Sequence, residues 1–184
     1  MTAAARSDTR RHNTPVRRVP WVMAVLLLLA STGAATADEP FREPDFVTIS
    51  AGGFDVNDDM TAGQFGAEFR LNTRLWIFRP QVGLLVTTDS AFYAYAGLYT
   101  DFYFGKRVVL SPSFSVGGFH EGDGKDLGGA LEFRSAIELA YRFDNASRLG
   151  VQIGHLSNAS IYDANPGEEF IILNYSIPTT VFDR

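Results

Sequence analysis

A histidine, a serine and a carboxylate near the end of the chain have the residue types of an ester-cleaving triad. His155 and Ser157 are two positions apart, and Glu169 follows further along. A serine hydroxyl becomes a good nucleophile when a histidine removes its proton, and a carboxylate orients that histidine and stabilises its imidazolium form. Residues two apart on a β-strand share one face with Cα atoms about 6.5–7 Å apart, a gap that side chains bridge. The chemistry is available if the fold brings the three side chains together.

All three side chains fall on the apolar face of a predicted strand. In the segment 148–157, the residues of one face are, in steps of two, Leu149, Val151, Ile153, His155 and Ser157. In the segment 169–178, Glu169 shares its face with Ile171, Leu173, Tyr175 and Ile177. Polar groups on an apolar face cost free energy, so their presence there favours a functional role. The alternative stays open that His155 only bonds to loop backbone and Ser157 only ends its strand.

Alternation of apolar and polar residues with period two runs through most of the chain. It is most regular in 64–72 and 130–143, and no stretch beyond residue 37 has apolar residues at helical spacing for three turns. We predict eight strands of roughly ten residues. Their ranges are about 45–54, 64–72, 75–86, 91–102, 107–118, 130–143, 148–157 and 169–178.

The two faces of these strands favour a membrane barrel over a soluble sheet. A ladder of opposite charges, typical of a narrow polar barrel interior, lies on one face of 130–143 and consists of Glu132, Arg134, Glu138 and Arg142. Connections alternate between long ones near 55–63, 119–127 and 158–168 and tight ones near 72–74, 103–106 and 144–147. Outer-membrane barrels have short turns on the inner side and long loops outside. We therefore predict an all-β fold, an eight-stranded antiparallel transmembrane β-barrel.

The N-terminal residues 1–37 have the pattern of a cleaved signal peptide. Several arginines precede an apolar run from Trp21 to Ala30, and Ala35-Thr36-Ala37 offers small residues to a signal peptidase. The apolar run of about ten residues is shorter than the ~20 that a membrane-spanning helix needs. We predict cleavage before Asp38, which leaves residues 38–184 as the outer-membrane barrel.

Composition excludes several other classes of protein. The 184 residues contain no cysteine and carry a formal charge of −5. A disulfide-stapled scaffold, a cysteine metal site and a thiol nucleophile are excluded, and the acidic balance argues against a nucleic-acid partner. Asp55, Asn57 and Asp59 resemble the start of a calcium loop, but Met60 and Gly66 break the pattern. We predict no cofactor and no metal site.

The predicted topology puts the three candidate residues near the external loop 158–168. At the outer membrane boundary a polar group on the lipid face costs only ~0–1 kcal/mol, against ~2–4 kcal/mol for a basic residue at the midplane. An oxyanion could be held there by backbone N–H groups after Ser157, or by the side chains of Asn158 and Asn165. Both asparagines suit a loop-shaping role equally well.

The C-terminal motifs resemble those of a known family. Gly154-His155-Leu156-Ser157-Asn158-Ala159, then Asn165-Pro166-Gly167-Glu168-Glu169, then Tyr175-Ser176-Ile177-Pro178, are similar to the lipid A 3-O-deacylase (PagL type) family of Gram-negative outer membranes. The resemblance implies an eight-stranded barrel whose lipid-facing triad hydrolyses the acyl ester at position 3 of lipid A. Lipid A, or lipopolysaccharide of the outer leaflet, would be the partner.

Carried over residue by residue, the resemblance makes Ser157 the nucleophile, His155 the general base and Glu169 the acid that orients it. Glu168 is the rival for the third role, but alternation turns it inward. Asn158 and Asn165 match the motif as oxyanion-hole or loop-shaping residues.

Other functions remain open from sequence alone. One is a non-catalytic small barrel that serves adhesion or envelope stability. Another is a phospholipase or acyltransferase barrel. The sequence also leaves the oligomeric state open, a homodimer included.

Overall fold

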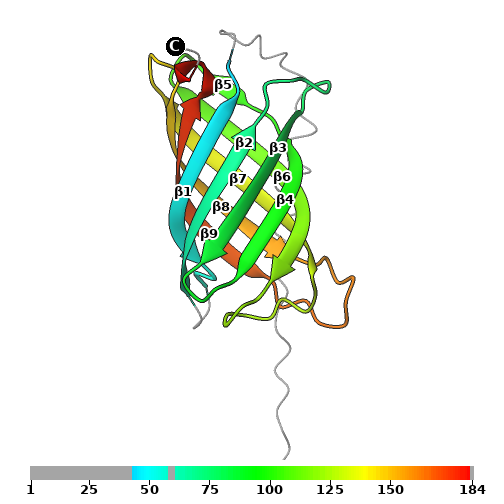
Figure 1. The fold of residues 1–184 in the computed structure, drawn as a ribbon. Helices are drawn as coiled ribbons and strands as arrows, with labels where there is room; N and C mark the ends of the chain where they lie inside the picture. The colour runs from blue at the N-terminus through cyan, green and yellow to red at the C-terminus, as the bar shows by residue number, and fades with distance from the viewer. Residues whose placement is uncertain (1–42, 58–60, 183–184) are drawn as a thin grey trace, which may run out of the picture. The chain divides into compact units, whose positions relative to one another are not determined.

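The computed structural model describes residues 43–57 and 61–182 (Figure 1). The predicted signal peptide, residues 1–37, lies outside the described residues. The strands are β1 Phe46–Phe54, β2 Ala62–Arg70, β3 Arg79–Thr87, β4 Phe92–Tyr99, β5 Phe102–Phe104, β6 Val108–His120, β7 Leu131–Arg142, β8 Arg148–Ser157 and β9 Glu168–Pro178, followed by the short 3₁₀ helix η1 Thr179–Val181. Within these described residues, no helix is both long and apolar enough to cross a membrane.

The strands form a closed antiparallel barrel. Consecutive strands pair from β1 to β4 and from β5 to β9, β1 pairs with β9, and β6 pairs with β4 as well as with β5. The short strands β4 and β5 lie one after the other along β6, so they are two parts of one barrel strand and the barrel is eight-stranded. This confirms the predicted fold class and all but the ends of the predicted strand ranges.

Two local features of the strands differ from the prediction. The strand predicted to run through 91–102 is interrupted at Thr100 and Asp101, which lie opposite Pro112 and Ser111 in the register of β6. Pro112 has no N–H to donate, so the ladder cannot be complete at this point. The strand predicted from residue 75 begins at Arg79, because Trp76 takes a left-handed φ of 64° in a turn between Leu75 and Phe78.

The barrel has a polar interior and an apolar outer face, the reverse of a soluble protein. Side chains fully buried inside include Gln64, Gln81, Glu132, Glu138, Arg148, Gln152 and Glu168. Exposed outward-facing side chains include Phe65, Leu84, Phe114, Leu139, Ile153 and Leu173. Alternation along every strand produces both faces at once, as in transmembrane barrels.

Ion pairs and hydrogen bonds join charged side chains buried in the middle of the barrel. Arg70 contacts Glu138 with an Nη2–Oε2 distance of 2.6 Å and also pairs with Glu68. The Asn174 amide donates a hydrogen bond to Glu138 at 2.9 Å. Arg134 donates to Gln152 at 2.6 Å. Arg70 of β2 and Glu138 of β7 are separated in the wall by β1, β9 and β8, so their contact crosses the lumen and joins distant parts of the wall.

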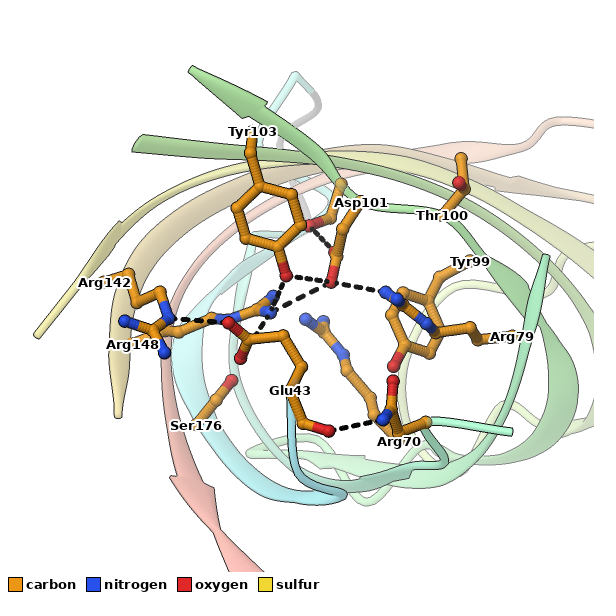
Figure 2. Close-up of polar contacts among 12 residues, drawn as sticks. Glu43, Arg70, Arg79, Tyr99, Thr100, Asp101, Tyr103, Arg142, Arg148 and Ser176 are labelled. Carbon is orange, nitrogen blue, oxygen red and sulfur yellow. Dashed lines mark hydrogen bonds and ion pairs between the residues drawn. The ribbon is translucent and has the colours of Figure 1, made fainter. Parts of the chain in front are cut away.

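A second charged cluster fills the turn end of the barrel, which is the end that carries the tight connections 105–107 and 143–147 and where β1 begins and β9 ends (Figure 2). We call the opposite end, where β1 ends and β2 begins and which carries the long connections 121–130 and 158–167, the loop end. Glu43 precedes β1, is buried, and pairs with Arg142 at 2.7 Å and Arg148 at 3.3 Å. Asp101, at the strand interruption, accepts hydrogen bonds from Arg79 and Arg148 at 3.0 Å each. The interruption therefore places a carboxylate among the arginines of the lumen.

Removing a buried charge should destabilise the barrel far more than removing a surface charge. Glu138→Ala leaves Arg70 buried with one partner fewer, and we expect the free energy of unfolding to fall by about 3–5 kcal/mol. Asp144→Ala breaks the exposed pair with Arg107 (2.7 Å) and should have little effect. Urea titration of both variants folded in detergent micelles measures the difference. Equal losses would contradict the structural role of the buried network.

Candidate active site

The register of the last hairpin brings His155 and Glu169 into contact. His155 of β8 lies directly opposite Glu169 of β9, and both side chains point to the outer face of the barrel. The imidazole Nδ1 is 3.3 Å from the Glu169 Oε1. The histidine side chain is 35% exposed and the glutamate 46%, so the pair lies at the surface of the barrel. With Nδ1 turned to the carboxylate, Nε2 is the nitrogen that can accept a proton.

Ser157 is the last residue of β8 and lies on the same outer face, two positions from His155. It is half-buried, and its register partner on β7 is Phe133. Among the described residues, the Ser157 hydroxyl has no hydrogen-bond partner. The structure thus puts the three predicted residues on one patch at the loop end and joins two of them directly. Hydrogen bonds between nucleophile and base are often long in unliganded hydrolases and tighten when substrate binds.

Asn158 organises the loop that follows the serine. It is fully buried, and its Nδ2 donates hydrogen bonds to the backbone oxygens of Leu127 and Ala164, both at 2.8 Å. Its Oδ1 accepts from the Ser160 N–H at 2.9 Å, and its own N–H donates to the Asn165 Oδ1 at 3.1 Å. These contacts fold the loop 158–167 onto the loop 121–130. The two predicted asparagines therefore hold the backbone beside Ser157.

Gly167 forms part of the wall around the imidazole, a role that sequence reasoning missed. It is buried, with a φ of 63°, and a Cβ at this position would lie 2.8 Å from the His155 Cε1 and 3.2 Å from Nε2. Only glycine combines this left-handed backbone with such a close approach. The sequence signal was the Pro166-Gly167 pair, which reads equally well as an ordinary turn.

Glu168 points the other way from its neighbour Glu169. It is buried inside the barrel, and its Oε2 accepts a hydrogen bond from the Asp55 N–H at 2.9 Å. Its carboxylate therefore lies across the barrel wall from His155. This placement agrees with the inward orientation that alternation predicts.

The described residues hold no group of three histidine, cysteine, aspartate or glutamate side chains close enough to bind a metal ion. His120 is exposed at the end of β6, where its register partner is Phe92 of β4. It is separated from His155 by β7. The polar side chains that the candidate site brings together are those of a serine, a histidine and a glutamate.

Comparison with known proteins relates this chain to one family. The profile of the family described as lipid A 3-O-deacylase (PagL) matches residues 32–178. A protein named lipid A deacylase PagL, from Bordetella bronchiseptica, is 32% identical over 89 residues, which cover 48% of this chain and 42% of that protein. A crystal structure of the outer membrane enzyme PagL superposes with a TM-score of 0.56 and 22% identity, over 73% of this chain and 99% of that one. The superposition shows a shared fold.

Asn158→Asp tests the loop-organising contacts. The aspartate keeps an oxygen for the Ser160 N–H but loses both bonds that the Asn158 amide donates. Because buried acceptors would be left unpaired, we expect the loop 158–167 to open more often. Limited digestion of the folded barrel with chymotrypsin, which cleaves after exposed Tyr162, should then be at least several-fold faster. Asn145→Asp, at the turn end, is the matched control and should leave the rate unchanged, whereas equal rates in both variants would refute this role.

Proposed function

Because the chain belongs to the lipid A 3-O-deacylase (PagL) family, whose fold is an outer-membrane barrel, we propose that it hydrolyses the ester-linked acyl chain at position 3 of lipid A. We propose Ser157 as the nucleophile, His155 as the general base and Glu169 as the acid that orients the base. The observation that carries this assignment is the 3.3 Å contact between His155 and Glu169, beside Ser157, on the outer face of the barrel.

The proposed reaction has two stages. As the Ser157 Oγ attacks the ester carbonyl carbon, the His155 Nε2 accepts its proton and Glu169 stabilises the imidazolium. The bond between the carbonyl carbon and the sugar oxygen then breaks, and the imidazolium returns the proton to the departing oxygen. A water molecule activated by the same histidine cleaves the acyl-enzyme, which releases a fatty acid and regenerates the serine hydroxyl.

The outer face suits a substrate that already lies in the membrane. Neighbours of the site on this face are apolar and exposed, including Ile153, Ile171 and Leu173. An acyl chain in the outer leaflet can reach this wall by lateral diffusion, so an internal pocket is not needed. Apolar side chains exclude water from one side of the ester and strengthen electrostatic contacts there, while the hydrolytic water enters from the loop end.

The loop after Ser157 supplies a candidate donor for the oxyanion. The N–H groups of Asn158, Ser160 and Ile161 are all bonded inside the loop. Among the described residues, the N–H of Ala159 has no such partner. The φ of Ala159 is 55°, so the backbone leaves the strand conformation at this residue. We propose that this N–H stabilises the negative charge of the tetrahedral intermediate. In this scheme Asn158 and Asn165 act indirectly, by holding the loop backbone.

Ser157→Ala should abolish deacylation, because the variant has no nucleophile. Mass spectrometry of lipid A from Gram-negative cells that express the protein should show loss of one 3-linked acyl chain with the native sequence only. Ser50→Ala, a serine of β1 on the inner face, is the matched control and should behave as the native protein. Unchanged lipid A in all three strains, with the barrels folded in the outer membrane, would overturn the proposed function. Free fatty acid as the product separates hydrolysis from acyl transfer.

Substitution of each of the neighbouring glutamates Glu168 and Glu169 distinguishes a role in the triad from a structural role. Glu169→Gln keeps the side-chain shape but removes the charge that stabilises the imidazolium, so we expect kcat to fall about 100-fold or more. Glu168→Gln changes a side chain inside the barrel and should leave kcat within a few-fold of the native value. Initial rates on purified lipid A in detergent micelles measure both variants. A larger loss in Glu168→Gln would make the inner carboxylate the functional one.

A further inference from the structure

The outer face of the barrel carries very few polar side chains. On the outward-facing positions of the described strands, the residues that are neither apolar nor aromatic are His120, Ser135, His155, Ser157 and Glu169. His120 ends its strand at the loops. The other four lie together on the adjacent strands β7, β8 and β9. Three of them form the proposed triad, which leaves Ser135 as a polar residue that the reaction does not use.

Ser135 lies directly beside the imidazole. In the register of β7 and β8 its partner is His155, and in the register of β8 and β9 the partner of His155 is Glu169. Side chains of directly opposed residues have Cβ atoms about 4.5–5.5 Å apart. Ser135 and Glu169 therefore flank the histidine on its two sides.

Aromatic side chains lie on the side of Ser135 that faces away from His155. Its register partner on β6 is Phe114, and Phe114 stacks on Phe133 with ring centroids 5.9 Å apart. Among the described residues, the hydroxyl has no hydrogen-bond partner, and the side chain is half-buried. A hydroxyl in apolar surroundings is unfavourable unless a partner completes its hydrogen bond. A molecule that lies on this face can supply such a partner.

The position of Ser135 relative to Ser157 indicates which part of a substrate could contact Ser135. Ser157 lies opposite Phe133, and Ser135 is two residues further along β7, away from the loop end. An acyl chain with its carbonyl at Ser157 extends in this same direction, toward the membrane interior. Two residues of a strand span about 6.5–7 Å. The side chains of Ser157 and Ser135 and a substituent on the acyl chain shorten this gap, so a hydroxyl on one of the first few carbons beyond the carbonyl comes within reach of Ser135.

We propose that Ser135 is a specificity residue that hydrogen-bonds a hydroxyl on the scissile acyl chain, at the third carbon. The inference rests on the proposed ester hydrolysis at Ser157. A chain with this hydroxyl completes the hydrogen bond of Ser135, whereas an unsubstituted chain leaves it unpaired. The site then prefers 3-hydroxyacyl esters, because a polar group built to bind a hydroxyl discriminates against the analogue that lacks it.

An internal competition measures this preference directly. Two synthetic glucosamine lipids, which differ only in whether the 3-O-linked tetradecanoyl chain carries a 3-hydroxyl, are mixed in the same detergent micelles with the full-length folded protein. Mass spectrometry of the two released acids gives the ratio of their kcat/KM values. This ratio does not depend on how much of a variant is folded. Ser135→Ala removes the hydroxyl, and Ser135→Thr retains it on a residue that suits a strand.

We expect the native protein to favour the hydroxylated lipid by about five- to tenfold, the effect of one hydrogen bond. The ratio should fall close to one in Ser135→Ala and return in Ser135→Thr. A native ratio of one, or a preference that Ser135→Ala leaves unchanged, would overturn the inference while ester hydrolysis stands. A residue that only positioned His155 would slow both lipids equally and leave the ratio unaltered. Release of neither acid by the native protein would overturn both the inference and the proposed function.

Discussion

Closure of the antiparallel ladder is the constraint on which the rest of this molecule depends. Inside a bilayer, water cannot satisfy backbone groups, so every N–H and C=O of the wall must find a partner in a neighbouring strand. Pairing of β1 with β9 removes the last free edge. Once the ladder is closed, each side chain of a strand points either into the lumen or to the outer face. The alternation of polar and apolar residues in the sequence therefore produces a polar lumen and an apolar outer face.

The lumen shows how the barrel accommodates the charges that this division places inside. Arg70, Glu138 and their partners form ion pairs across the middle, and Glu43 and Asp101 meet the arginines of the turn end (Figure 2). Removing one member of such a network leaves a buried charge unpaired, which is strongly destabilising. The network therefore stabilises the positions of the strands that it joins. The interior is thus occupied by structural contacts, and the proposed site lies on the outer face.

The proposed site exists because a few polar residues depart from the apolar pattern of the outer face. His155, Ser157 and Glu169 lie near the loop end, where such residues cost least. The rigid ladder sets the contact between His155 and Glu169, and the buried Asn158 sets the loop behind Ser157. Strand register and loop packing thus supply the pre-organisation that a pocket supplies in a soluble hydrolase.

The sequence by itself determined the barrel, its eight strands and the outer face on which the three residues of the proposed triad lie, because alternation is a local property that each strand carries independently. It also turned Glu168 inward and Glu169 outward. Contacts between distant segments were decided only by the tertiary structure. Pro112 interrupts a strand whose own residues read as continuous, and Asn158 bonds to Leu127, 31 residues away. Register across three strands is equally non-local, which is why Ser135 could be placed beside His155 only after the barrel had closed.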